Sequence, residues 1–256
     1  MELNNFTALS VDQVVEAFHQ LHGKENLKRS VFNVWLHVVE HASSVGEALR
    51  KDEYTEAFCA LARVFGWLCS FVAKCYYDEK AESVFKLNKK LSEIVWYKYP
   101  GMCYACVTFP CHCLTRKREV ERTKRLTPEQ EKLLAFARKS GKGPANIDGW
   151  AQMFEAIYGN YHYASPLGST GFHLLEEVGE VAKSVVDLEE KGAGDRSEEL
   201  VGKTRDEIAD VFSWLFAVVL KLRFISESVA PLYGKTETIE LSTIVWKTYK
   251  EELRTL

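Results

Sequence analysis

The sequence lacks the features of an exported or membrane-spanning protein. Residues 1–13 contain neither a basic region nor an apolar core, so we expect no signal peptide. The longest apolar run, Val211–Leu220, is much shorter than the roughly 20 residues that a membrane-spanning helix needs. A net charge of −3 gives no overall attraction to nucleic acid or to a membrane surface. We therefore expect a cytoplasmic protein whose seven cysteines are thiols or metal ligands rather than disulfides.

The sequence also lacks any convincing run of alternating apolar and polar residues, which would indicate β-strands. The periodicity is helical nearly throughout, and the first hundred residues predict a helix after Ser10 followed by helices over 30–50, 54–77 and 81–99. Hydrophobic residues make up 46% of the chain and charged residues 27%, as in ordinary soluble proteins. We expect an all-α fold, and 256 residues suffice for one large domain or two small ones.

Five carboxylates on two apolar helices are the most informative feature. They are Glu176, Glu177 and Glu180 in HLLEEVGEVAK, and Glu207 and Asp210 in RDEIADVFSWL. Residues three or four apart share a helix face, so the acids gather on one side of each helix. If the two helices pack together, the carboxylates repel one another unless a divalent cation binds between them. Carboxylates without histidine or cysteine suit Mg²⁺ or Mn²⁺.

The alternative is that these acids belong to solvated helix faces. Thr204-x-x-Glu207 matches a capping box, so Glu207 would then simply begin its helix. The apolar residues beside the acids, among them Val178, Ile208 and Val211, favour helices that pack against each other and so favour the metal site.

The chain contains a hidden repeat. At an offset of 136 residues, Asp12 aligns with Asp148 and His37 with His173. At an offset of 147, residues 60–68 match residues 207–215 at five of nine positions, and at an offset of 150, residues 91–99 match residues 241–249 at six of nine. We interpret this as a duplicated four-helix unit. The alternative is that amphipathic helices share a common binary pattern.

The first copy has lost most of the acids. Only Glu40, the counterpart of Glu176, keeps a carboxylate. The positions that correspond to the other four acids hold His41, Ser44, Ala60 and Arg63. Because an arginine repels a divalent cation, we expect the first half to be catalytically silent.

Between the copies, four cysteines lie within eleven residues, in the pattern C-x2-C-x4-C-x-C. They are Cys103, Cys106, Cys111 and Cys113. Four thiolates at such spacing can bind one tetrahedral Zn²⁺, so we predict a structural zinc site, with free thiols or a redox switch as the alternatives. His112 is a spare ligand. The other cysteines lie on an apolar helix, where they are typical of a core.

A basic run, residues 115–125, follows the cysteines. No aromatic residue interrupts this run to stack on bases, so we interpret it as a solvated linker helix rather than a nucleic-acid contact. Thr127, Pro128 and Gln130 then predict the start of another helix, because they supply a cap, a proline at the first position and a reciprocal side chain.

The pattern EExxE followed by ExxD resembles that of the MazG-like all-α nucleoside triphosphate pyrophosphohydrolases, over about residues 147–250. The resemblance implies attack of water at the α-phosphate of a (d)NTP, which gives a nucleoside monophosphate and pyrophosphate. It implies that Glu176 positions or deprotonates the water. The implied magnesium ligands are Glu177, Glu180, Glu207 and Asp210.

Similar proteins are oligomers, so the resemblance also implies an intrachain pseudo-dimer and leaves a further homodimer open. The expected parts are a degenerate repeat (1–99), a cysteine-rich loop with a linker helix (100–146) and a catalytic repeat (147–256). Tyr158, with Tyr161, His162 and Tyr163, is a candidate for a base pocket, and the alternative is that these aromatic residues belong to the core or its rim. The candidate phosphate-binding cations are Lys203, Arg205, Lys221, Arg223, Lys235 and Lys247. The alternatives are another all-α pyrophosphohydrolase activity and a helical protein that senses nucleotide without hydrolysing it.

Overall fold

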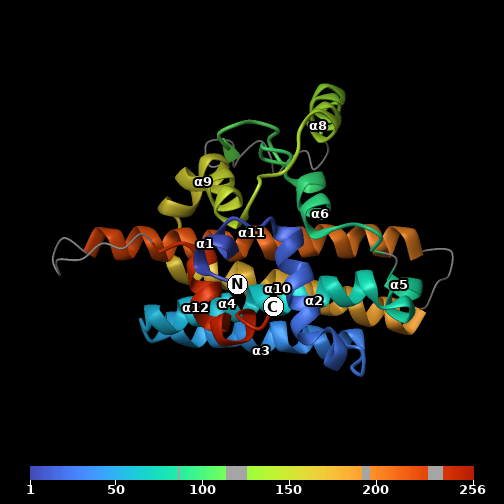
Figure 1. Cartoon of the computed structure of the whole chain (residues 1–256). Helices are drawn as coiled ribbons and strands as arrows, with labels where there is room; N and C mark the ends of the chain where they lie inside the picture. The colour runs from blue at the N-terminus through green and yellow to red at the C-terminus, as the bar shows by residue number, and fades with distance from the viewer. Residues whose placement is uncertain (86, 114–125, 192–196, 230–238) are drawn as a thin grey trace.

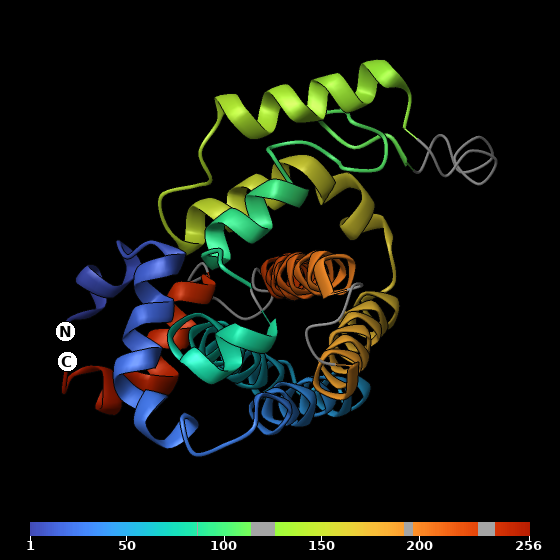
Figure 2. The same cartoon turned by 90° about the vertical axis from the view of Figure 1, so that its right-hand side faces the viewer.

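The computed structural model describes residues 1–85, 87–113, 126–191, 197–229 and 239–256, and over these residues it is all-α, as predicted. Four long helices form the centre: α3 (Val31–Arg50), α4 (Tyr54–Tyr77), α10 (Leu167–Lys191) and α11 (Ser197–Val229). Figure 1 shows them running side by side, and Figure 2 shows the same bundle turned by 90°. The helices form two hairpins, α3 with α4 and α10 with α11, and α3 also packs along α10.

The core between the hairpins is aromatic and aliphatic. Trp35 on α3 is completely buried, and its indole nitrogen donates a hydrogen bond to the carbonyl oxygen of Val178 on α10 at 3.1 Å. Phe65 on α4 and Phe212 on α11 meet at the centre with ring centroids 6.3 Å apart. Each such side chain buries its apolar surface for about 2–3 kcal/mol, so this core fixes how α10 and α11 lie relative to α3 and α4.

Shorter helices cover the bundle, and each half of the chain places one of them on the other half. Helix α2 (Val11–Asn26) packs on α4, and α9 (Ile147–Ala164) packs on α11. Helix α6 (Leu91–Lys98), from the first half, packs across α11, whereas α12 (Leu241–Leu253), from the second half, packs across α4. The remaining elements are α1 (Leu3–Thr7) beside α12, α5 (Glu79–Phe85) beside α4, and α8 (Pro128–Ser140). In Figures 1 and 2, α6, α8 and α9 all lie on one side of α11.

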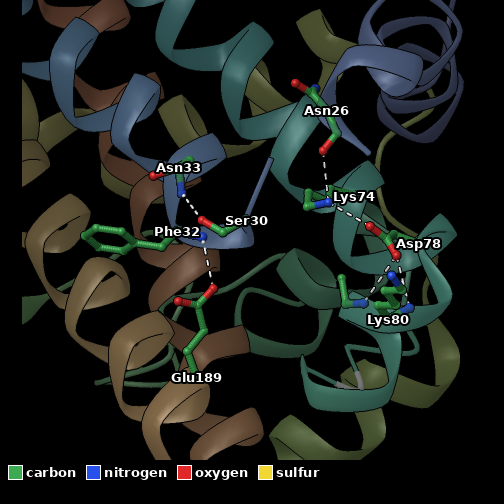
Figure 3. Close-up of polar contacts among 9 residues, drawn as sticks. Asn26, Ser30, Phe32, Asn33, Lys74, Asp78, Lys80 and Glu189 are labelled. Atoms are coloured by element: carbon green, nitrogen blue, oxygen red, sulfur yellow. Dashed lines mark hydrogen bonds and ion pairs between the residues drawn. The ribbon is translucent and has the colours of Figure 1, made fainter. Parts of the chain in front are cut away.

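Polar contacts fix the end of the bundle shown in Figure 3. Lys74 on α4 donates to the carbonyl oxygen of Asn26 at 2.9 Å and to the carboxylate of Asp78 at 2.7 Å, and both side chains of that ion pair are buried. Glu189 on α10 accepts a hydrogen bond from the backbone N–H of Phe32, in the first turn of α3. A free N–H group at a helix start is therefore paired with a carboxylate from the other half of the chain.

Most of the predicted helices are confirmed, and α4 has the predicted bounds. Thr127 accepts from the Gln130 N–H at 3.3 Å and its own N–H donates to the Gln130 side chain at 2.9 Å, which is the predicted capping box of α8. The basic run 115–125 lies outside the described residues.

One prediction about helix boundaries is wrong, and one alternative weighed for the acidic helices does not hold. The single helix predicted over 81–99 is two helices. The first, α5, ends at Phe85, and Asn88 between the two adopts a left-handed conformation with φ of 43°. The capping box at Thr204 does not form, since α11 already begins at Ser197. Thr204 instead lies inside α11 and its hydroxyl donates to the carbonyl oxygen of Leu200 at 2.8 Å.

Among the described residues, α4 alone is long and apolar enough to cross a membrane by length and composition, with a mean hydropathy of 1.5 over its most apolar window. Of that window, 83% is buried against the other helices. A core helix of a soluble protein has the same properties, so α4 is weak evidence for a membrane span.

Candidate metal site and adjoining cavity

Three of the predicted acids come together between α10 and α11. Glu177 on α10 and Glu207 and Asp210 on α11 each offer a carboxylate oxygen, and these oxygens all lie within 4.8 Å of one another. The i,i+3 spacing on α11 and the packing of the hairpin bring them there. Glu207 and Asp210 are each only 8% exposed, so the three charges are close together and mostly shielded from water.

This crowding disfavours the ionised carboxylates. Burial, followed by the charges of Asp210, Glu207 and Glu180, raises the pKa of Glu177 to about 8. Burial and the charges of Glu180 and Asp210 raise the pKa of Glu207 to about 7. Burial also raises the pKa of Asp210, although hydrogen bonds from two neighbouring side chains oppose the shift.

Those two neighbours are Lys98 and Tyr99, at the end of α6. The Lys98 ammonium forms an ion pair with Asp210 and also donates to the carbonyl oxygen of Asp206 at 3.2 Å. The Tyr99 hydroxyl donates to the second carboxylate oxygen of Asp210. The first half of the chain therefore supplies a cation and a hydrogen-bond donor to the acids of the second half.

The other two predicted acids are not part of this cluster. Glu180 is exposed but lies beside Glu207, whose pKa it raises. Glu176 is also exposed, and its carboxylate is 3.1 Å from Nδ1 of His173, one turn earlier. His173 in turn stacks on Trp214 with ring centroids 4.5 Å apart. Glu176 is thus outside the three-carboxylate cluster.

The donor set fits a hard divalent cation. Three carboxylates within 4.8 Å, with a fourth beside them and no histidine or cysteine, match the oxygen ligands that Mg²⁺ and Mn²⁺ prefer. Their raised pKa values show that the protein alone does not fully compensate the negative charge. A bound cation would remove this penalty.

The four cysteines of the predicted zinc site also come together, with all four sulfurs within 4.8 Å of one another. The Cys103 and Cys113 sulfurs are 3.7 Å apart, and the Cys106 and Cys111 sulfurs 3.9 Å apart. Zn–S bonds of about 2.3 Å place sulfurs about 3.8 Å apart at the corners of a tetrahedron, so the spacing fits a Cys₄ metal site.

A cavity of about 210 Å³ joins the two candidate metal sites. Glu177, Asp210 and Ser213 line one part of it, and residues of the cysteine loop line another. Its remaining walls are largely aromatic and consist of Tyr99, Tyr158, Tyr161, His162 and Trp214. Tyr158, predicted as a candidate base-pocket residue, therefore lines this cavity, and the polar part of the cavity lies at the carboxylates.

Of the predicted phosphate-binding cations that the structure describes, Lys203 lies beside the acids, with its ammonium 3.9 Å from Glu207 and its side chain half-exposed. Arg205 donates to the carbonyl oxygen of Leu87 at 2.9 Å, and Lys247 lines a different cavity. Lys235 lies outside the described residues.

Two further candidate cations are engaged in other contacts. Lys221 is buried and donates to the carbonyl oxygen of Tyr163 at 2.6 Å. Arg223 forms ion pairs with Glu155 at 2.6 Å and with Glu240 at 3.2 Å. None of these partners belongs to the carboxylate cluster.

Lys98 and Tyr99 were not predicted as site residues. Both lie at the end of the segment 91–99 that repeats at an offset of 150, and Lys98 aligns with an uncharged residue, Thr248. A basic residue present only in the acid-poor copy is a signal that its partner lies in the other copy.

No protein-family model, curated protein or solved structure matches this chain.

Proposed function

We propose that the protein is a magnesium-dependent nucleoside triphosphate pyrophosphohydrolase, which converts a (d)NTP and water into a (d)NMP and pyrophosphate. The observation that carries this proposal is the cluster of Glu177, Glu207 and Asp210, beside an aromatic cavity. Buried carboxylates with raised pKa values in a cleft are typical of functional sites. The MazG-like resemblance of the acidic pattern supplies the substrate class and the phosphorus that is attacked.

In this proposal, Glu177, Glu207 and Asp210, with Glu180 beside them, would hold Mg²⁺. The ion would neutralise negative charge on the triphosphate and on the leaving pyrophosphate. Lys98 and Lys203, at the edge of the cluster, complement the phosphate charge.

The water oxygen bonds to the α-phosphorus while the bond between that phosphorus and the bridging oxygen to the β-phosphate breaks. The pyrophosphate takes the electron pair of the broken bond, and a base takes a proton from the water. Glu176 remains the candidate base, and its carboxylate lies 3.1 Å from Nδ1 of His173.

We further propose that the chain is a duplicated pair of MazG-like units. Several contacts of the first half recur at the aligned positions of the second. Ser92 donates to Asp12 at 2.6 Å, and its counterpart Ser242 donates to Asp148 at 2.8 Å. The crossing of α6 onto α11 is likewise matched by the crossing of α12 onto α4.

The histidine–glutamate pair recurs as well. His37 lies 3.3 Å from Glu40 and stacks on Trp67, as His173 lies 3.1 Å from Glu176 and stacks on Trp214. Such repetition supports a pseudo-dimer whose first half, though poor in acids, completes the second half's site through Lys98 and Tyr99.

Substitution of single acids tests the proposal. We expect Asp210→Asn and Glu180→Gln to abolish magnesium-dependent turnover of (d)NTPs while circular dichroism shows unchanged helical content. Glu40→Gln, an acid on the first half's equivalent helix, is the matched control and should keep full activity. Full activity in Asp210→Asn would refute the metal site, and binding of nucleotide without turnover by the wild type would favour a sensor.

A further inference from the structure

The loop that carries the four cysteines is part of the cavity beside the carboxylates. Cys103, Tyr104 and Ala105 line the cavity from this loop, as do Cys111 and Cys113. The loop follows directly after Tyr99, whose hydroxyl donates to Asp210. A segment that looks like an independent zinc module in sequence therefore forms a wall of the candidate active site.

The loop is firmly attached on two sides. The backbone N–H of Cys111 donates to the carbonyl oxygen of Ile157 on α9 at 2.8 Å. The side chain of Gln130 on α8 donates to the carbonyl oxygen of Cys106 at 3.2 Å. Cys103 and Cys106 also pack against the buried Ile157 side chain. A metal bound to the four sulfurs would add a covalent constraint to these contacts.

Tyr104 is the side chain that this loop presents beside the acids. Its ring meets the Tyr99 ring edge to face, with centroids 5.5 Å apart, and the Lys98 ammonium lies over its ring, 5.1 Å from the centre. Tyr104 is nevertheless 44% exposed, so part of its side chain remains open to a ligand. An aromatic ring so placed suits stacking on a nucleobase.

His162 provides a buried polar group in the aromatic part of the cavity. It is only 4% exposed, and neither ring nitrogen has a hydrogen-bond partner among the described residues. A buried polar group without a partner costs about 1–3 kcal/mol, which a ligand can recover by hydrogen bonding to it. Burial lowers the pKa of His162 to about 4, so at neutral pH the ring offers one donor and one acceptor.

We propose that this cavity binds the base of the nucleotide, with the cysteine loop as one wall, Tyr104 covering the ring and His162 hydrogen bonding to its polar edge. This inference rests on the proposed function, because the carboxylates at the end of the cavity would then bind the triphosphate through magnesium. It assigns the cysteine loop a role in substrate recognition beyond stability.

Calorimetric titration tests the assignment without turnover. The ligands are the α,β-methylene analogues of the four dNTPs and inorganic tripolyphosphate, which has no base, all with Mg²⁺. The variants are Tyr104→Ala and His162→Gln, with His162→Phe as a second form that fills the same space. The matched control is Phe109→Ala, since Phe109 lies on the same loop, is 60% exposed and does not line the cavity.

We expect Tyr104→Ala to weaken binding of the preferred analogue by about 5- to 150-fold, the range that loss of one stacking contact produces. The His162 variants should reduce the difference in affinity among the four analogues. Neither change should affect tripolyphosphate binding, and Phe109→Ala should bind like the wild type.

Three results overturn the inference. They are unchanged nucleotide binding in both the Tyr104 and His162 variants, an equal loss of nucleotide and tripolyphosphate binding, and a wild type that binds no analogue. A wild type that binds the analogues base-selectively but hydrolyses no parent nucleotide would contradict the proposed function alone.

Discussion

The raised pKa values of the carboxylate cluster make metal binding depend on pH in a way that can be calculated. Metal ligands must be deprotonated, and Glu177 and Glu207 have pKa values of about 8 and about 7. At pH 6 both are mostly protonated, so a cation must displace nearly two protons. At pH 8 Glu207 is ionised and Glu177 is about half ionised.

Affinity for Mn²⁺ should therefore rise by more than about 100-fold between pH 6 and pH 8, and most of the rise should occur below pH 7. Stability should follow the same linkage. Because both folded-state pKa values are raised, the metal-free protein loses stability as pH increases from about 4.5 through 7 to 8. The increase in Tm caused by the cation should consequently be larger at pH 8 than at pH 6.

Isothermal titration of Mn²⁺ in two buffers with different ionisation heats measures both the affinity and the protons released. Glu177→Gln is the control, since it removes the group with the higher pKa and should remove about one proton from the release. An affinity that changes less than about threefold from pH 6 to pH 8, or binding without proton release, would refute the reasoning.

Three more perturbations have defined outcomes. Lys98→Met leaves the buried Asp210 carboxylate without its ion-pair partner, so without metal we expect a loss of about 3 kcal/mol and a Tm lower by about 5–10 °C. Scanning calorimetry with and without Mg²⁺ measures this, and an unchanged Tm would contradict the ion pair. Cys106→Ser should reduce bound zinc from about one ion per chain to none by elemental analysis, and retained zinc would rule out the Cys₄ site. Glu176→Gln should lower kcat at least about 100-fold with little change in Mn²⁺ affinity, whereas Glu40→Gln should not; equal kcat in both would exclude Glu176 as the base.

The sequence predicted those parts of the structure that depend on local pattern. Caps such as Ser10 and Thr127 mark helix starts, and the i,i+3 acids on α11 lie on one face. The break before α6 was missed because residues 81–99 keep a helical pattern and the left-handed residue is Asn88, not glycine. The capping motif at Thr204, which supported the alternative of solvated helix faces, lies inside a long helix and does not mark a helix start.

The contacts between halves depend on the tertiary structure. Lys98 and Asp210 are 112 residues apart, and no local pattern relates them. They meet because α6 crosses onto α11, a consequence of how the two hairpins pack. The position of the cysteine loop against α9 likewise follows from the packing of Cys103 and Cys106 on Ile157. Sequence spacing predicts the metal ligands of this loop but not the cavity that it lines.

The most direct test of the account is the reaction itself, carried out on purified protein with a panel of NTPs and dNTPs in ¹⁸O-labelled water, with Mg²⁺ or with EDTA. The account predicts a nucleoside monophosphate that carries the label, unlabelled pyrophosphate, and no reaction in EDTA. A diphosphate with inorganic phosphate as products, label in the pyrophosphate, or turnover that persists in EDTA would contradict it.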